Sequence, residues 1–274
     1  MIIRFFHLFI NSQSPQASFF CIFAERTPMK TIGHHFNALI WTLQQFGKGK
    51  YLLYFIPGIL FALGFWWLEN WSESLVSPDS IEENTAWYSN LWRKSVSQTG
   101  HFLSFIFHQL AIFFILTLLS PINTFLSESV DANLTSEKIG FDVMRFINDF
   151  IRMIFVVLIA ISLELLIMGI WSLISWVFGF QFLNPTIFFI TVAFFYGFSF
   201  YDYSLERNKI SVMGSIRFAK RYSFPTLITG ILFSTLLLIP VLGLAVAPVI
   251  MTIVSTHVFL KIMGKLDKPT TATE

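Results

Sequence analysis

Residues 224–260 form an apolar stretch that is too long for a single helix across a bilayer. These 37 consecutive positions contain no Asp, Glu, Lys or Arg. One straight helix of that length would measure about 55 Å, whereas the bilayer core is about 30 Å thick. Pro240 and Gly243 divide the stretch into arms of 16 and 17 residues, and Pro248 weakens the second arm. We therefore expect a helical hairpin that penetrates the bilayer only part way.

The composition of the whole chain also favours lipid surroundings. Of the 274 residues, 55% are hydrophobic and 12% are charged, whereas soluble domains carry about 25% charged residues. Phenylalanine contributes 34 residues and tryptophan 8, and both suit acyl chains or the bilayer interface. We predict an all-α integral membrane protein in contact with the lipid bilayer.

Several function classes are excluded by what the sequence lacks. The net charge is +2, without the basic face that a nucleic-acid partner requires. The single cysteine, Cys21, cannot form an intrachain disulfide or a thiolate metal site. His101 and His108 share a helix face, but no acidic residue joins them at metal-ligand spacing. There is also no nucleophile elbow, phosphate-binding loop or zinc-protease motif, so we expect no metal, no cofactor and no enzymatic activity.

Two apolar runs in the first half of the chain are candidate membrane helices. Residues 51–68 contain no charge, and Pro57 with Gly58 is expected to kink this run, which membranes tolerate. Residues 102–119 form the next run, which we expect to end at Ser120 and Pro121.

Two further runs come before the long hairpin. Residues 153–178 contain one charge, Glu164, and residues 186–201 contain none. Asn184 and Pro185 predict a turn between them, which makes 170–201 a second candidate hairpin. Because hairpins return to the side they left, we expect two to four full crossings rather than six or seven.

The N-terminal region divides into two parts. Residues 1–28 show no helical period and no clear signal-peptide cleavage site, which predicts a disordered or mis-annotated extension ahead of Met29. Residues 31–46 predict an amphipathic helix at the interface. We assign 29–265 to one membrane domain and 266–274 to a polar tail.

The loops differ in charge and so predict the orientation. Loop 69–100 has five acidic and two basic residues, whereas loop 202–223 has five basic and two acidic residues. Basic loops favour the cytoplasm. This places loop 202–223, the polar helix-prone segment 122–152 and the C-terminus inside, with loop 69–100 outside.

Gly47, Lys48, Gly49 and Lys50 are the first candidates for an anion site. If they open a helix, free backbone N–H groups, the helix dipole and two ammonium groups would suit an oxyanion. The alternative is a cytoplasmic loop whose lysines only obey the positive-inside rule.

Three charged residues within or next to the apolar runs are candidates for a pathway or for coupling. Glu164 is the sole charge of its run, and intramembrane carboxylates are costly and often functional. It either takes part in coupling, bonds a neighbouring helix as a neutral acid, or lies at the interface. Asp202, between Tyr201 and Tyr203, is either an interface anchor or the partner of Arg207 or another basic group.

Four short motifs follow one another along residues 36–262. The first is Gly49 with neighbouring lysines, followed by Pro57. The second is Ser120-Pro121-Ile122-Asn123, followed by Phe125-Leu126-Ser127-Glu128, Val130-Asp131-Ala132 and Leu134-Thr135. The third is Tyr201-Asp202-Tyr203 before Asn208-Lys209, and the fourth is Ile239-Pro240 with Pro248. In this order they resemble the CysZ-like sulfate permeases and their eukaryotic relatives, the etoposide-induced membrane proteins.

The resemblance implies a fold and a function. The fold would have two long transmembrane helices plus helical hairpins that enter the bilayer without cleanly crossing it. The function would be that of an inner-membrane permease or channel for sulfate or a similar small oxyanion, feeding sulfur assimilation and cysteine synthesis. Short, partly inserted helices need neighbours to enclose a path, so the resemblance also implies a homo-oligomer.

One position departs from the family pattern. The family tends to carry arginine in the loop before the first span, where this chain has Lys48 and Lys50. A lysine is a point charge, whereas arginine offers a planar fork to an oxyanion. A different substrate, or a non-transporting role in organising the membrane, is therefore the alternative.

Overall fold

The computed structural model describes residues 28–75, 112–136, 143–239 and 242–266. Within these ranges the chain is helical and forms no strand, which confirms the predicted all-α class. Residues 1–27 and His101 lie outside the described residues, so the predictions for the N-terminal extension and for that histidine stay predictions.

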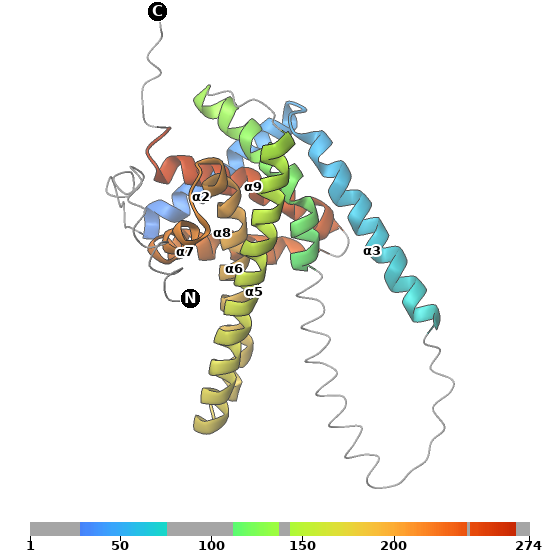
Figure 1. The fold of residues 1–274 in the computed structure, drawn as a ribbon, viewed down its shortest axis with the longest axis vertical. Helices are drawn as coiled ribbons and strands as arrows, with labels where there is room; N and C mark the ends of the chain where they lie inside the picture. Colours follow the sequence, from blue (N-terminus) through green and yellow to red (C-terminus); the bar gives the residue numbers. More distant parts are fainter. Residues whose placement is uncertain (1–27, 76–111, 137–142, 240–241, 267–274) are drawn as a thin grey trace, which may run out of the picture.

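Figure 1 shows the helices of the described residues. In chain order they are α2 (Pro28–Gly47), the 3-10 turn η3 (Leu52–Tyr54), α3 (Phe55–Leu75), an unlabelled helix Ile112–Thr135, α5 (Val143–Phe178), the 3-10 turn η5 (Gln181–Leu183), α6 (Asn184–Arg207), α7 (Val212–Arg221), α8 (Ser223–Leu237) and α9 (Leu242–Ile262).

Four segments within the described ranges are long and apolar enough to cross a membrane. They are Ile112–Thr135, Phe150–Phe178, Gln181–Arg207 and Gly243–Ile262. The expectation of an integral membrane protein is therefore confirmed. Which of these segments cross fully, and which penetrate only part way, stays a prediction.

The long apolar stretch folds back as its length requires. Helix α8 ends at Leu237 and α9 begins at Leu242, so the expected hairpin is confirmed, while Pro240 lies outside the described residues. Gly243 is needed at the turn, because a Cβ there would lie 2.4 Å from the Leu236 carbonyl oxygen. Pro248 lies inside α9 without ending it.

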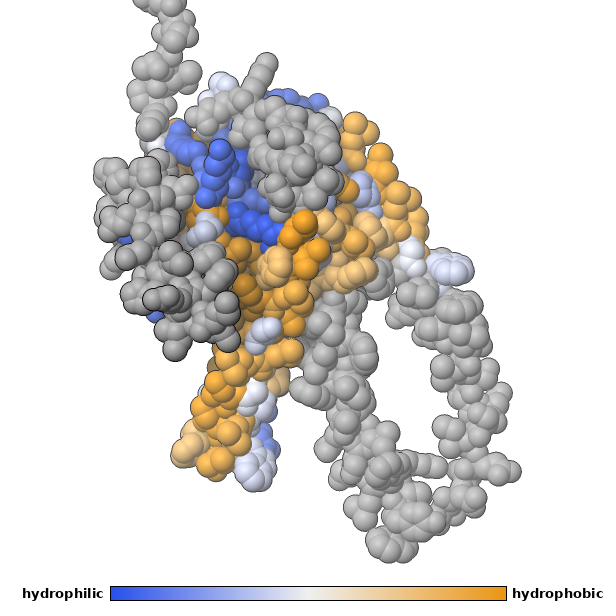
Figure 2. Space-filling view, viewed as in Figure 1, coloured by the Kyte–Doolittle hydropathy of each residue, from blue (hydrophilic) through white to orange (hydrophobic). Residues whose placement is uncertain are grey.

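The second hairpin consists of α5 and α6. The chain turns at Gly179, whose φ is 74°, and Pro185 lies in the first turn of α6, where its fixed φ fits. The Trp171 indole N–H donates to the Asn184 side-chain oxygen at 3.0 Å and joins the two helices. The predicted hairpin is thus confirmed, but its turn lies at residues 179–183, and Asn184 and Pro185 begin α6. The pair extends as an arm from the rest of the structure (Figure 1), with an apolar surface (Figure 2).

Two proline predictions are wrong. Pro121 does not end a helix but lies inside Ile112–Thr135, so part of the predicted polar segment 122–152 continues an apolar helix. The reason is packing, because Leu126 and Val130, beyond the proline, are fully buried against Val249 and Ile253 of α9. Pro57 lies in the first turn of α3, where proline is tolerated, rather than at a kink.

The close crossing of α6 and α8 holds the centre of the structure together. A Cβ on Gly197 would lie 1.9 Å from the Thr226 carbonyl oxygen, and one on Gly230 would lie 1.5 Å from the Ala193 carbonyl oxygen. Only glycine at both positions lets the two backbones touch. The second half of α6 is consequently buried, from Phe195 to Arg207.

Helix α2 turns its polar side inward. Its buried side includes Thr31, His35, Thr42 and Gln45, whereas its exposed side carries Ile32, Phe36, Ile40 and Leu43. An exposed apolar stripe at this spacing is what a helix at the membrane interface presents to lipid. This arrangement agrees with the prediction for residues 31–46.

We predict that Gly230→Ala lowers the melting temperature of the detergent-solubilised protein by roughly 5 °C or more, because overpacking against a backbone cannot be relieved by a rotamer change. Gly169→Ala on α5 is the matched control, since a Cβ there meets nothing within 4 Å. Equal melting temperatures for both variants would show that the α6–α8 contact is not as close as described.

His35 supplies a second prediction. Its Nδ1–H donates to the Thr31 carbonyl at 2.8 Å, and Nε2 accepts from the Thr229 hydroxyl at 2.9 Å, as a neutral ring requires. Burial lowers the pKa of His35 from 6.5 to about 4. At a pH between these two pKa values, His35 is protonated in the unfolded chain but neutral in the folded chain. The free energy of unfolding therefore falls as the pH drops from about 6.5 towards 4.

Unfolding measured between pH 7.5 and 5 should therefore show a steeper loss of stability for the parent protein than for His35→Gln, which cannot take up the proton. Parallel pH curves for the two proteins would mean that His35 is already accessible to protons in the folded state.

Candidate functional site

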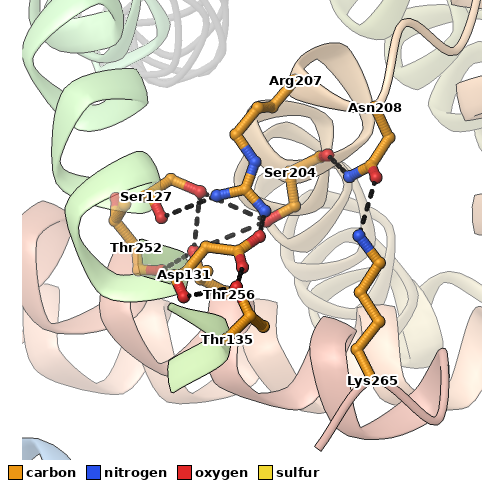
Figure 3. Close-up of polar contacts among 9 residues, drawn as sticks. All are labelled: Ser127, Asp131, Thr135, Ser204, Arg207, Asn208, Thr252, Thr256 and Lys265. Atoms are coloured by element: carbon orange, nitrogen blue, oxygen red, sulfur yellow. Dashed lines mark hydrogen bonds and ion pairs between the residues drawn. The ribbon is translucent and has the colours of Figure 1, made fainter. Parts of the chain in front are cut away.

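A buried polar cluster lies where the helix Ile112–Thr135, α6 and α9 meet (Figure 3). We call it the Arg207 cluster. Its members, all buried, are Ser127, Asp131, Ser204, Arg207, Thr252 and Thr256. Buried polar groups must bond one another, because unpaired ones are costly in an apolar interior.

Helical spacing brings these side chains together. Ser127 and Asp131 are four residues apart, as are Thr252 and Thr256, and Ser204 precedes Arg207 by three. Each pair therefore lies on one face of its helix. Three helices each turn one polar face towards the same point, which is why the site is recognisable only after the helices are packed.

The ion pair between Arg207 and Asp131 is the centre of the cluster. The Arg207 Nη1 also donates to the Ser127 carbonyl at 3.2 Å, and the Asp131 Oδ1 accepts from the Thr135 hydroxyl at 2.7 Å. Both charged side chains are only 3% exposed. A charge pair this deeply enclosed is strongly coupled, because water screens it little.

Three hydroxyl groups lie beside the ion pair. The Thr256 hydroxyl is 2.9 Å from that of Ser127 and 3.4 Å from that of Ser204, and the two serine hydroxyls are 3.3 Å apart. Hydroxyls donate as well as accept and can rotate to suit a ligand. The cluster therefore combines a guanidinium fork with adjustable O–H donors.

Asn208 and Lys265 extend the network at the end of α6 (Figure 3). The Asn208 side-chain N–H donates to the Ser204 carbonyl at 2.7 Å, and its oxygen accepts from the Lys265 ammonium at 3.1 Å. These bonds close the C-terminus of α6 and fix the backbone that carries Arg207.

Asp202 belongs to a second, separate ion pair. Its Oδ1 accepts from Arg152 Nη2 at 2.9 Å, and the same nitrogen donates to the Ser215 hydroxyl at 3.1 Å. Of the two partners suggested for Asp202, Arg207 is wrong, and the alternative, another basic group, is confirmed by Arg152. Five positions along an α-helix rotate a side chain by about 140°, so the two residues face different neighbours.

The interface-anchor interpretation of the two tyrosines is also wrong. Tyr201 and Tyr203 are 0% exposed. The Tyr201 hydroxyl lies 3.3 Å from that of Thr229, and the Tyr203 hydroxyl lies 3.4 Å from the Asn123 amide nitrogen and 3.5 Å from the Leu116 carbonyl oxygen. They are core residues that join α6 to its neighbours.

Glu164 lies in the middle of the apolar segment Phe150–Phe178 and is 1% exposed. This burial removes the interface position from the three interpretations of the carboxyl group. Its roles in coupling or in bonding another helix remain predictions. Glu164 is not a member of the Arg207 cluster.

Gly47, Lys48, Gly49 and Lys50 close α2 rather than open a helix. The N–H groups of residues 48, 49 and 50 donate to the carbonyls of Gln45, Phe46 and Gln45 at 3.1, 2.9 and 3.0 Å. Gly49, with a φ of 74°, is the left-handed residue of this cap. The free N–H groups expected at residues 48–50 are therefore absent. The C-terminal end of α2 also carries the negative end of the helix dipole, which repels anions.

Lys50 nevertheless contacts the helix that carries Asp131. The exposed Lys50 ammonium donates to the Asn133 side-chain oxygen at 3.2 Å, and Asn133 follows Asp131 by two residues. The exposed Lys50 ammonium group therefore lies at the C-terminal end of the helix Ile112–Thr135, which carries the buried Asp131.

Sequence reasoning missed the hydroxyls and the role of Asp131. The signal was present as polar residues spaced by four in otherwise apolar helices, at 127, 131 and 135 and again at 252 and 256.

No group of three His, Cys, Asp or Glu that would hold a metal occurs among the described residues.

A family model described as "Sulfate transporter CysZ/Etoposide-induced protein 2.4" matches residues 38–248. The match covers more than three quarters of the chain and includes Ser127, Asp131, Ser204 and Arg207. No curated protein matches the chain.

We predict that Asp131→Ala and Arg207→Ala each lower the free energy of unfolding by about 3–5 kcal/mol, because either change leaves one buried charge without its partner. The double variant should lose less than the sum of the two. Arg217→Ala, at an exposed position of α7, should change stability by less than about 0.5 kcal/mol. Strictly additive losses in detergent unfolding would contradict the pairing.

Proposed function

Because the chain belongs to the CysZ/etoposide-induced protein 2.4 family, we propose that it is an inner-membrane permease or channel for sulfate or a similar small oxyanion. The observation that carries this proposal is the Arg207 cluster. A guanidinium group and several hydroxyls lie buried at the junction of three apolar helices. We assign the protein no enzymatic reaction.

The chemistry of the cluster matches an oxyanion. A guanidinium donates two parallel N–H bonds to two oxygens of one tetrahedral anion, which a lysine cannot do. The hydroxyls of Ser127 and Ser204 provide additional donors in one hydrogen-bonded group with Thr256, whose own hydroxyl is also 2.7 Å from the Thr252 carbonyl oxygen. Neutral donors suit a site that must release its anion, because they bind more weakly than charged ones.

Asp131 occupies the place of the anion in the structure described. Its carboxylate is itself an oxyanion that pairs with Arg207, so an arriving sulfate must displace it. The carboxylate therefore acts as an internal plug, which keeps Arg207 satisfied when no substrate is present and prevents an open leak.

Lys48 and Lys50 then attract the anion to the mouth of the path. Both are exposed, and Lys50 contacts Asn133 close to Asp131. Their contribution rests on ammonium charge and not on backbone N–H groups. We propose that this face and the C-terminus are cytoplasmic, that copies of the chain associate to enclose the path, and that the anion supplies cysteine synthesis.

Uptake of radiolabelled sulfate into proteoliposomes tests the function. The parent protein should exceed empty vesicles, and Arg207→Lys should reduce uptake by about tenfold because the fork is lost while the charge stays. Arg217→Lys makes the same exchange at an exposed position of α7 and should transport normally.

Uptake equal to that of empty vesicles would overturn the proposal. Remodelling of the vesicles without any anion flux would instead favour the alternative function, a protein that organises the membrane. Melting temperatures of the variants, measured in parallel, separate lost transport from lost folding.

A further inference from the structure

We propose that a groove between α5, α6 and α8 binds one acyl chain of an anionic phospholipid, whose headgroup lies on the basic face of α7. This site is separate from the Arg207 cluster and does not depend on the proposed transport function. Three independent features of the described residues support it: the shape of the groove, its polarity and the charge beside it.

The groove is apolar and of ligand size. Its volume is about 300 Å³, at the lower end of the range for small-molecule sites. The residues that line it are Ile167 of α5, Ile190, Thr191, Phe194 and Phe195 of α6, and Ser223, Phe224 and Leu227 of α8. It lies between α8 and the hairpin arm of α5 and α6, whose surface is apolar (Figure 2) and suits contact with lipid.

Two polar residues, Thr191 and Ser223, are part of the lining. The Thr191 hydroxyl already donates to the Ile187 carbonyl at 2.8 Å, so it offers little to a ligand. Ser223, at the start of α8, is exposed and stands next to the exposed Phe224. The end of the groove at Ser223 is therefore polar and exposed, next to the end of α7, which suits the polar part of a lipid.

Helix α7 brings basic residues to that polar end. Ser215, Phe218 and Ala219 are buried, which leaves the opposite face to Met213, Arg217, Lys220 and Arg221, all exposed. Arg221 precedes Ser223 by two residues, so their Cα atoms lie within about 7 Å. A short helix with basic and apolar residues on its exposed face is typical of a membrane surface that attracts anionic lipids.

The charge pattern selects the type of lipid. Three exposed cations stand within five positions of one helix, and the acidic residues nearest in sequence, Asp202 and Glu206, are buried on α6. A phosphate group with a net negative charge complements this face, whereas a zwitterionic headgroup brings its own cation to it. We therefore assign the site to an anionic phospholipid rather than to membrane lipid in general.

Native mass spectrometry of the detergent-solubilised full chain tests the assignment. Phosphatidylglycerol should remain bound at a concentration at least about tenfold lower than phosphatidylcholine with the same acyl chains. Glycerol phosphate, which has the headgroup but no chains, should not bind. Similar retention of the two phospholipids by the parent protein would overturn the proposal.

Two variants separate the headgroup from the chain. Replacing Arg217, Lys220 and Arg221 with alanine should reduce phosphatidylglycerol retention to the level of phosphatidylcholine. Leu227→Trp fills the groove and should reduce retention of both lipids. Lys48→Ala combined with Lys50→Ala removes exposed cations elsewhere and should leave retention unchanged.

Melting temperatures measured alongside identify any variant that fails to fold. Should the triple variant be unstable, Arg217→Glu alone supplies the same test by reversing one charge. If a folded variant without these cations retained phosphatidylglycerol unchanged, the bound lipid would be an adventitious additive only, and the assignment would be wrong.

Discussion

The buried ion pair between Arg207 and Asp131 is the interaction on which the arrangement of the described helices depends. It joins α6 to the helix Ile112–Thr135, while the hydroxyls of Ser127 and Thr256 join that helix to α9. In an apolar interior neither charge is tolerated alone. The pair therefore fixes the relative positions of these helices, where apolar packing by itself would permit them to slide.

The same ion pair is central to the proposed function. Under that proposal Arg207 later receives an anion, which an apolar residue could not do, and in the described structure Asp131 of a neighbouring helix neutralises its charge. Asp202 and Arg152 form a second ion pair on another side of α6. Elsewhere on α6, the close contacts of Gly197 and Gly230 pack its backbone against that of α8.

Much of the fold was predictable because the length and composition of each segment decide whether that segment forms a membrane helix and where it breaks. A charge-free stretch of 37 residues has to fold back, and Asn184 with Pro185 indicates a break between two helices, which the structure places just before them. The failures share a different cause. Pro121 was expected to end a helix by its own chemistry, but burial of Leu126 and Val130 outweighs the lost hydrogen bond. The N–H groups of residues 48–50 were expected to be free, but they cap the helix before them.

The candidate site was less predictable, because it is assembled from residues that lie up to 129 positions apart, as the Ser127–Thr256 contact does. The sequence singled out Arg207 and Asp202 but left the partner of Asp202 open between Arg207 and another basic group. The way the helices face each other decides that Asp202 pairs with Arg152 and Arg207 with Asp131.

The most direct test of the account is infrared difference spectroscopy of the protein before and after addition of sulfate, with Asp131→Asn as the reference. If sulfate displaces Asp131 from Arg207, a carboxylate band should shift in the parent protein and be missing from the variant. Identical difference spectra for the two proteins would contradict the claim that the oxyanion binds at this ion pair.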